Sequence, residues 1–298
     1  MKYQLVGNFI RPKNYTFFEI TVIIPTYRPG KFLFECLASI SKQTIDIQNI
    51  EVLIILNGDK YPYINIVTEY IQQLPLMNIK FYYIESKGVS NARNLGMEVA
   101  TAEFIAFIDD DDLISESYLE GFHDVRKDEF MATNLKSFDE EEENKKKLKS
   151  DYITHCYKKN YFSPHFNFFK CRQFFSNPVG KIIPKNLIEN KKFDLELENG
   201  EDSLFMFSIS NRVKNIKLSA PDACYLRRIR KDSVSRKERE FSYHFVNAWK
   251  LICKYSEVFF KNRKNYSTAL YLSRIAATII KLTRQLAGKF IETTTRSM

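Results

Sequence analysis

The sequence has little cysteine, glycine and proline, and it has no long apolar run. Its five cysteines are scattered and no two stand at zinc-ligand spacing, so neither a disulfide framework nor a structural zinc site is indicated. Nine Gly and nine Pro in 298 residues argue against a fibrous or disordered chain. The N-terminus has no secretory hydrophobic segment, and no window of about 18 uninterrupted apolar residues occurs. We therefore expect a folded cytoplasmic protein without a membrane-spanning helix.

Two phosphate-binding motifs and all recognisable nucleic-acid modules are also missing. Neither Gly-x-Gly-x-x-Gly nor a P-loop is present, which disfavours a Rossmann dinucleotide site and a P-loop ATPase. The net charge is +9, and the chain from Phe241 onward carries ten Lys and Arg against two Glu. A basic surface without a binding module does not favour nucleic acid as a partner. An anionic membrane surface or another local anionic partner fits this charge better.

The first 126 residues alternate between strand-like and helix-like patterns. Short β-branched and aromatic runs predict strands at Ile20–Pro25, Ile50–Leu56, Ile79–Ile84 and Glu103–Ile108. Apolar residues at helical spacing lie between these runs, on Leu33, Leu37 and Ile40, then on Ile64, Val67 and Ile71, and again from about Val89 to Ala100. This alternation predicts an α/β fold with a mostly parallel sheet and helices on both faces.

The pattern is less regular after about Phe130. The charge run Asp139–Asp151 predicts a solvated loop or a frayed helix. A helix is expected over Glu198–Val213, a strand over Ile216–Leu226, and two helices over Glu240–Ile291. In the last helix, Leu272, Ile275, Ala276, Ile279, Leu282 and Leu286 are expected on one side, with Arg274, Lys281, Arg284 and Lys289 mostly on the other.

Polar clusters follow three of the predicted strands. These clusters are Pro25-Thr26-Tyr27-Arg28, Asn57-Gly58-Asp59 and Asp109–Asp112. Because open parallel sheets bind ligands beyond the carboxyl ends of their strands, we expect the clusters to converge at one edge. Adjacent carboxylates repel unless a cation neutralises them, and such ligands suit Mg²⁺ or Mn²⁺. A solvated acidic loop, with Asp112 or Ser115 capping a following helix, is the alternative.

Four segments in register resemble one enzyme family. They are Ile20–Tyr27 (ITVIIPTY), Lys87–Gly96 (KGVSNARNLG), Phe104–Asp112 (FIAFIDDDD) and Gly200–Phe205 (GEDSLF). Together they resemble the family 2 glycosyltransferases of the GT-A fold, over roughly Glu19 to Arg236. The resemblance implies an inverting enzyme that uses a nucleotide-diphosphate sugar, most commonly UDP-linked, and a divalent metal, Mn²⁺ or Mg²⁺.

The resemblance also implies roles for individual residues. Asp109 and Asp111 would be the DxD pair, with Asp109 toward the ribose and Asp111 on the metal. Asp202 would be the general base that takes the proton of the acceptor hydroxyl, and Glu201 would support the site or contact the acceptor. The remaining candidates for nucleotide-sugar binding are Pro25, Thr26, Tyr27, Asn57, Asp59, Arg93, Asp110, Arg228 and Arg230. Asn57 stands where many family members have Asp, which leaves the identity of the base open.

The resemblance predicts a domain plan and a biological setting. The plan has an N-terminal extension (1–18), a catalytic domain (19–236) and a basic helical C-terminal region (237–298). The catalytic domain would comprise a nucleotide-sugar half (about 19–112) and an acceptor half (about 113–236). The acceptor would be a saccharide or lipid-linked saccharide in capsule, lipopolysaccharide or exopolysaccharide synthesis. The C-terminal helices could then bind the inner membrane surface peripherally, or pack on the domain with their charges in water.

Two other functions remain open at this stage. A sugar nucleotidyltransferase would share the architecture, but it usually needs a Gly-rich basic loop after the first strand. The segment Thr26–Lys31 has one Gly and two basic residues and matches this poorly. A catalytically silent binding protein that keeps the GT-A fold is the second alternative, and the intact acidic residues argue against it.

Overall fold

The computed structural model describes residues 2–9, 18–74, 77–140, 148–162, 166–230 and 240–296 of the chain. For residues 241 and 286–296 it describes the backbone only. Within these ranges a large mixed sheet forms the base of the fold, with the strand order β1-β4-β3-β2-β5-β10-β7-β11. Its strands are β1 (Tyr3–Phe9), β2 (Ile20–Thr26), β3 (Ile50–Asn57), β4 (Asn78–Ile84), β5 (Phe104–Phe107), β7 (Glu129–Ala132), β10 (Lys181–Pro184) and β11 (Asn215–Leu218).

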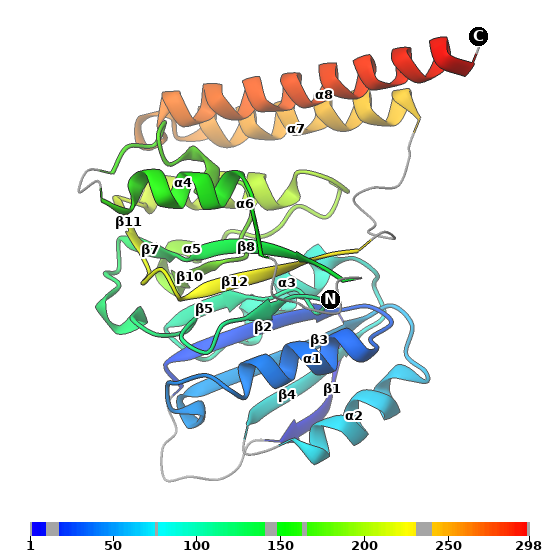
Figure 1. Ribbon diagram of the computed structural model, residues 1–298, viewed down its shortest axis with the longest axis vertical. Helices are drawn as coiled ribbons and strands as arrows, with labels where there is room; N and C mark the ends of the chain where they lie inside the picture. The colour runs from blue at the N-terminus through cyan, green and yellow to red at the C-terminus, as the bar shows by residue number, and fades with distance from the viewer. Residues whose placement is uncertain are drawn as a thin grey trace.

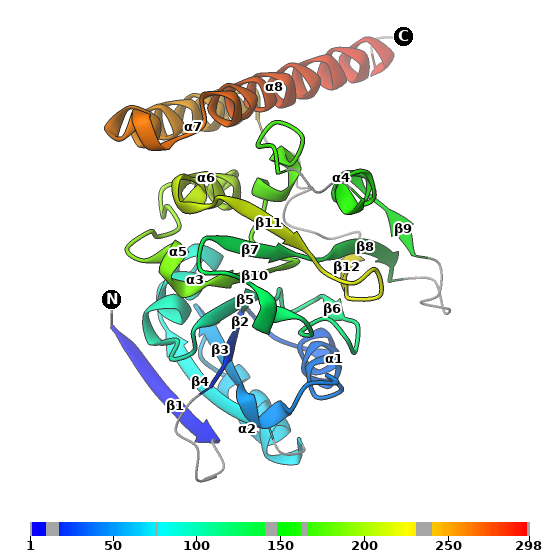
Figure 2. The ribbon, with the colours of Figure 1, turned by 90° about the vertical axis from the view of Figure 1, so that its left-hand side faces the viewer.

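The centre of this sheet is parallel, as the sequence predicted. Neighbours β4, β3, β2 and β5 all run parallel, whereas β1 and β10 are antiparallel to their neighbours. Every residue of β2 and β3 is buried, because helices cover both faces of the sheet. Figure 2 shows α1 (Lys31–Ile40) and α2 (Tyr63–Gln73) on one face and α3 (Val89–Val99) on the other.

Helix α3 packs very closely on β2. A Cβ atom added at Gly96 of α3 would lie 2.4 Å from Cγ2 of Ile23, a distance that real side chains do not adopt. Glycine at this position therefore lets the helix backbone approach the central strand. This approach matters for the site, because α3 carries Arg93 to the carboxyl edge of the sheet.

A second, smaller sheet lies beside that edge. Among the described residues it has the order β6-β12-β8-β9, comprising β6 (Leu113–Ile114), β8 (Asn134–Asp139), β9 (Lys149–Ser150) and β12 (Cys224–Ile229). Strand β6 directly follows the four aspartates, and β12 pairs with it and with β8. The small sheet thus brings β12, which carries Arg228, next to the acidic run.

Helices from the second half of the chain form the upper layers. Helices α4 (Tyr152–Tyr161) and α6 (Glu201–Ile209) pack above the sheets, and the short helix α5 (Lys185–Ile188) lies beside β10. The long helices α7 (Phe241–Lys261) and α8 (Thr268–Arg296) lie side by side as a hairpin across the top of the molecule (Figure 1). The two expected C-terminal helices are therefore present.

Several expectations differ from the structure in detail. Tyr3–Phe9 is not a separate extension but the edge strand β1, paired with β4. The expected strand Ile216–Leu226 is two strands, β11 and β12, in different sheets, because the chain turns at Pro221-Asp222. Within the charge run, residues 141–147 lie outside the described residues.

The two expected sides of α8 are not separated by burial. Leu272 and Ile279 of the apolar side are exposed, whereas Arg274 of the charged side is 8% exposed. Lys281 and Arg284, also of the charged side, are exposed. Ile275 does pack against the core, and Leu286 and Lys289 have no described side chains. The hairpin therefore turns charge, rather than only apolar surface, toward the catalytic half of the chain.

Candidate functional site

The three polar clusters meet at the carboxyl edge of the parallel strands, as predicted. Pro25 and Thr26 are buried at the end of β2, and Tyr27 is exposed just beyond it. The Tyr27 hydroxyl donates to Asp59 at 3.3 Å, which connects the ends of β2 and β3. Thr26 donates through its hydroxyl to Asp110, which connects β2 to the acidic run.

Asp59 is the centre of an exposed, mainly cationic cluster at this edge. Arg28 lies 2.6 Å and Lys87 3.2 Å from its carboxylate oxygens. The hydrogen bonds from Arg28 and then Lys87 hold the pKa of Asp59 below its ordinary value. The Asp59 carboxylate is thus engaged by Arg28, Lys87 and Tyr27 and remains partly exposed.

Asn57 is directed into the protein rather than toward this cluster. Its Nδ2 donates to the carbonyl of Thr26 at 2.7 Å, and its Oδ1 accepts from the Gly88 amide at 2.9 Å. Gly88, with φ +122°, begins α3. Asn57 therefore ties the end of β2 to the start of α3, a structural task that the sequence did not predict for it.

Arg93 connects the two acidic motifs. One Nη atom lies 2.6 Å from Oδ1 of Asp202 and the other lies 2.8 Å from Oδ1 of Asp109. The residue is 3% exposed and stacks over Phe193 at 5.3 Å. Burial alone would lower the pKa of Arg93, but the two carboxylates raise it above its ordinary value. The arginine is thus a permanently charged bridge between the end of β5 and the start of α6.

Two of the four aspartates are structural in this geometry. Burial raises the pKa of Asp110 to about 7, and the carboxyl accepts from Thr26. Asp112 accepts from the Tyr225 hydroxyl and the Arg228 amide, both at 2.7 Å, and burial raises its pKa well above the usual range. Strand β6 follows, so the expectation that Asp112 caps a helix is wrong. Asp112 instead fixes the acidic run to β12.

The other two aspartates, Asp109 and Asp111, face the cleft. Both line a cleft of about 900 Å³ at this edge of the sheet. Asp111 lies 2.6 Å from Arg230. Burial and the neighbouring charge of Asp109 raise the pKa of Asp111, and a cation between them would relieve that repulsion. No group of three acidic, His or Cys side chains suited to a metal occurs in the described part of the chain. Mg²⁺ and Mn²⁺ typically use one or two carboxylates plus substrate phosphates, so the residues present fit such an ion.

The two predicted arginines of β12 and its flank have different tasks. Arg228 is buried between Phe32 and Phe138, donates to the carbonyl of Asp111 at 2.8 Å and pairs with Glu35 at 2.6 Å. Arg228 therefore stabilises the backbone of the acidic run through its hydrogen bond to Asp111. Arg230 pairs directly with the Asp111 carboxylate, and its Nε is buried without a partner. A diphosphate near Asp111 would supply the hydrogen-bond acceptor that the Nε atom of Arg230 lacks.

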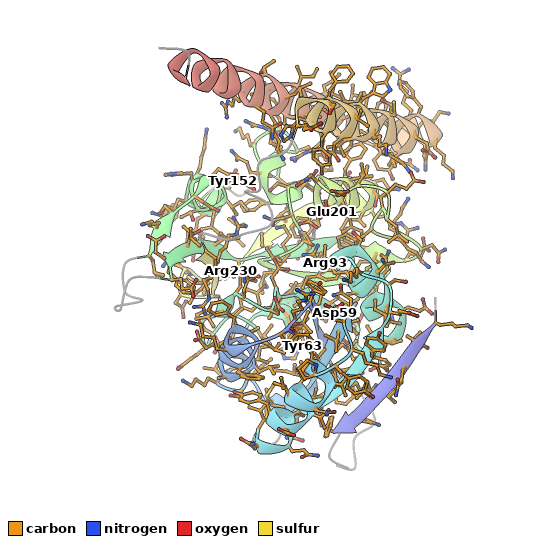
Figure 3. All side chains as sticks on the ribbon, turned by 90° about the vertical axis from the view of Figure 1, so that its right-hand side faces the viewer. Asp59, Tyr63, Arg93, Tyr152, Glu201 and Arg230 are labelled. Atoms are coloured by element: carbon orange, nitrogen blue, oxygen red, sulfur yellow. The ribbon has the colours of Figure 1, made fainter. Side chains whose placement is uncertain are left out.

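Glu201 and Asp202 line the same cleft from the first turn of α6. The helix begins at Gly200, whose φ of +97° is a left-handed conformation that other residues rarely adopt. Burial raises the pKa of Glu201 to about 7. Burial also raises the pKa of Asp202 although Arg93 opposes this. In Figure 3, Glu201 lies between Arg93 and the α7–α8 hairpin. A carboxylate of raised pKa in a cleft is suited to proton transfer.

The far wall of the same cleft comes from residues that the sequence analysis did not assign to the site. It includes Arg172, Tyr243, Arg274 and Lys281, contributed by a short 3₁₀ turn and by α7 and α8. The sequence analysis placed Arg274 and Lys281 on the charged side of the last helix, which was expected either to bind an anionic membrane or to lie in water.

Comparison with known proteins decides which family this geometry represents. The sequence profile of the family described as "Glycosyl transferase family 2" matches residues 21–184, more than half of the chain. The chain belongs to this family. It is 33% identical over 227 residues to the minor teichoic acid biosynthesis protein GgaB of Bacillus subtilis, which covers 73% of this chain and 24% of GgaB. It is 28% identical over 238 residues to the glycosyltransferase GlyA of Streptococcus pneumoniae, covering 73% of this chain and 32% of GlyA. The chain thus spans about a quarter to a third of these relatives.

Solved structures support the fold. Staphylococcus aureus TarS (residues 1–349, in complex with UDP-GlcNAc) matches with a TM-score of 0.67 at 20% identity, covering 88% of this chain and 71% of that chain. The mannosyltransferase PcManGT of Pyrobaculum calidifontis, in complex with GDP-Man and Mn²⁺, matches with a TM-score of 0.56 at 14% identity, covering 97% and 83%. The predicted GT-A fold is confirmed. None of the described helices combines the length and apolarity needed to cross a bilayer.

Proposed function

We propose that this family 2 member is an inverting glycosyltransferase that uses a nucleotide-diphosphate sugar. The observation that carries the proposal is one cleft lined by Asp109 and Asp111 from the end of β5 and by Asp202 from the start of α6, with Arg93 bridging Asp109 and Asp202. Inversion in one displacement needs the leaving group and the base on opposite sides of the reacting carbon. A cleft with acidic residues from two elements can provide this arrangement.

The donor would lie along the edge formed by β2, β3 and β5. The exposed cluster around Tyr27 and Asp59 is our candidate for the base, and Arg230 for the diphosphate, because its buried Nε lacks an acceptor. UDP is our first choice of nucleotide, supported by the UDP-GlcNAc complex of the TarS fold neighbour. Asn57, which family resemblance placed against the base, would instead maintain the shape of this edge.

Asp109 and Asp111 would hold Mn²⁺ or Mg²⁺ together with the donor diphosphate. A metal ion there stabilises negative charge on the departing nucleoside diphosphate. The Mn²⁺ complex of PcManGT supports this choice. The protein's own contribution is to orient both carboxylates. Arg93 pairs with Asp109, and Arg230 pairs with Asp111.

Asp202 would take the proton from the attacking acceptor hydroxyl. It lines the same cleft as the aspartates, and Arg93 fixes its orientation at 2.6 Å. Glu201, with a pKa raised by burial to about 7, would contact the acceptor or receive the proton afterwards. The names of GgaB and TarS support an acceptor in a bacterial surface glycan, such as a teichoic acid or another growing polysaccharide.

Peripheral membrane contact at the cytoplasmic face would use the outer side of the α7–α8 hairpin. Phe245, Trp249, Phe260 and Ile280 are exposed there, and such residues bind at bilayer interfaces. Sedimentation with anionic vesicles tests this part: replacing Trp249 with Ser should reduce the bound fraction. An unchanged fraction would remove the hairpin from the membrane proposal.

Nucleotide binding and transfer test the function in two steps. Melting curves with UDP, GDP and other nucleoside diphosphates, with and without Mn²⁺, should show a rise of several degrees for at least one of them with metal. A ligand at about 100 times its Kd adds about 2.7 kcal/mol of stability. If none of these ligands shifts the Tm, the proposal fails.

The second step examines the base. Asp202→Asn should reduce transfer and donor hydrolysis by about 10²–10⁴-fold and leave the UDP-dependent Tm shift intact. The matched control is Asp128→Asn, because Asp128 lies on the surface and pairs with Arg126 at 3.3 Å. Retained activity in the Asp202 variant would refute its role as base, and a silent binding protein would show no activity to lose.

A further inference from the structure

The cleft is acidic at one end and cationic at the other. Its acidic end is the catalytic group described above. The other end is lined by Arg172, Arg274, Lys281 and Arg284, which we call the cationic wall. Three of these residues lie on α8, a helix that contains none of the four recognition motifs. The proposed function so far gives the cationic wall no task.

Arg274 is the strongest sign that the cationic wall binds a ligand. It is 8% exposed, and its Nε atom is buried without a hydrogen-bond partner. One Nη atom donates to the carbonyl of Arg172, and no carboxylate in the described part of the chain forms an ion pair with Arg274. A buried guanidinium without an anion is costly, because its charge has lost water and gained no counter-charge. An anionic group entering the cleft would satisfy it.

Lys281 and Arg284 extend the same side of the helix toward the catalytic acids. They stand seven and ten residues after Arg274, spacings that keep side chains on broadly the same side of an α-helix. Lys281 lies close enough to Glu201 for its charge to oppose the rise in the pKa of that carboxyl. The cationic wall therefore approaches the first turn of α6 at Lys281.

We propose that the cationic wall binds a phosphate group of the acceptor, so that the enzyme glycosylates a phosphate-bearing glycan or polyol. This inference rests on the proposed function, because it assigns the acceptor side of the same cleft. Guanidinium and ammonium groups on one face are well suited to a phosphodiester or diphosphate. The phosphate would orient the acceptor with its hydroxyl at Asp202.

Position within the cleft assigns the cationic wall to the acceptor rather than to the donor. The donor diphosphate has its own cation in Arg230, which pairs with Asp111 on the opposite side. Glu201 lies between Arg93 and the α7–α8 hairpin (Figure 3), so the hairpin is on the far side of the acids from the donor edge. Membrane binding by these cations is a poorer fit, because their side chains line the cleft.

Binding measurements with defined probes test the proposal. The probes are a synthetic oligo(glycerol phosphate), a short-chain prenyl diphosphate and an uncharged oligosaccharide, each titrated calorimetrically into protein saturated with UDP and Mn²⁺. At least one phosphate-bearing probe should bind more tightly than the uncharged one. Binding of the phosphodiester indicates a polymer acceptor, and binding of the prenyl diphosphate indicates a lipid-linked acceptor. Equal affinity for all three probes overturns the proposal.

Variants assign the binding to the cationic wall. Lys281→Gln and Arg284→Gln should each weaken the phosphate-bearing probe about threefold, since both residues are exposed and screened by water. Arg274→Met should weaken it about tenfold or more, because hydrogen bonds to buried charges are stronger. Lys250→Gln on α7 is the matched control: it removes an equal charge at an exposed position outside the cleft lining.

The outcomes separate this proposal from the proposed function. If Lys281→Gln and Arg284→Gln bind the phosphate-bearing probe as tightly as Lys250→Gln does, the cationic wall is not the acceptor subsite. This test does not depend on the folding of Arg274→Met. If UDP with Mn²⁺ fails to raise the Tm of the wild-type protein, the proposed function fails instead. The Tm measurement uses no acceptor and so does not involve the cationic wall.

Discussion

Replacing Arg93 is the most informative perturbation of the catalytic cleft, because this residue touches both acidic motifs. Arg93→Met keeps most of the side-chain volume and removes the charge. Asp202 then loses a 2.6 Å charge-assisted hydrogen bond, and Asp109 loses one at 2.8 Å. Burial and the charge of Asp109 both raise the pKa of Asp202, and Arg93 is the strongest group opposing them. The variant should therefore protonate its base at a higher pH than the wild type.

The size of the effect follows from that one hydrogen bond. A bond to a charged group contributes about 1.5–3 kcal/mol, which corresponds to about a ten- to hundredfold loss of rate. The loss should be largest at acidic pH, where Asp202 is protonated in the variant and ionised in the wild type. It should shrink as the pH rises, because Asp202 then ionises without help. Saturating donor and Mn²⁺ limit the contribution of weakened binding at Asp109.

The assay is kcat for transfer or donor hydrolysis across the pH range in which the protein remains folded. The acid limb of the profile should move to higher pH in Arg93→Met and return part of the way in Arg93→Lys, which restores charge but not both contacts. Arg126→Met is the control, since Arg126 is exposed, pairs with Asp128 and Glu129 and does not line the cleft. A profile lowered by the same factor at every pH would refute the view that Arg93 tunes the base.

Three further changes probe the metal site, the interior and the packing of α3. Asp111→Ala should abolish the Mn²⁺-dependent part of the UDP-induced Tm shift, and a shift that persists unchanged would contradict the metal assignment. Burial lowers the pKa of Lys181 to about 7, so the unfolded chain binds more protons than the folded one above that pH. In urea titrations the stability of the wild type relative to Lys181→Met should therefore rise between pH 7 and 9, by at most about 1.4 kcal/mol per pH unit, whereas a flat difference would show that Lys181 stays charged. Gly96→Ala should reduce the free energy of unfolding by about 1–3 kcal/mol through its clash with Ile23, and an unchanged urea midpoint would show that α3 can move away from β2.

The local pattern of apolar residues in the sequence was sufficient to predict the parallel strands of the large sheet. Strands β2 and β3 are continuous apolar runs that are buried along their whole length, so the sequence signal and the environment coincide. Strand β1 was missed because it is an edge strand with mostly exposed residues, and its pairing partner β4 is about 70 residues away. Edge pairing of this kind leaves almost no periodic signal in a short segment.

The site was predictable in its membership and less so in its contacts. Motif order placed Asp109, Asp111 and Asp202 correctly at the edge of the cleft. It gave no indication that Arg93 would bridge two of them, because that contact depends on how closely α3 packs beside Gly96. Asn57 was assigned to a ligand by analogy, yet its two polar atoms are used by Thr26 and Gly88. The sequence shows that Asn57 can form hydrogen bonds, but not whether its partner is a ligand or the backbone of a neighbouring segment.

Helix α8 shows that charge periodicity alone is a poor guide to which residues are buried. A helix packed on a domain normally turns its apolar side inward, and such packing, with the charges in water, was one of the two expectations for the C-terminal helices. The preference assumes that the facing surface is apolar. Here α8 lines a cleft that also contains the carboxylates of Asp109, Asp111 and Asp202, so electrostatics favours cations on its inner side, and Arg274 is buried while Leu272 is exposed. Under the proposal above, part of the positive charge of the C-terminal region serves the acceptor side of this cleft, and the exposed apolar residues of the hairpin are the surface for the proposed membrane contact.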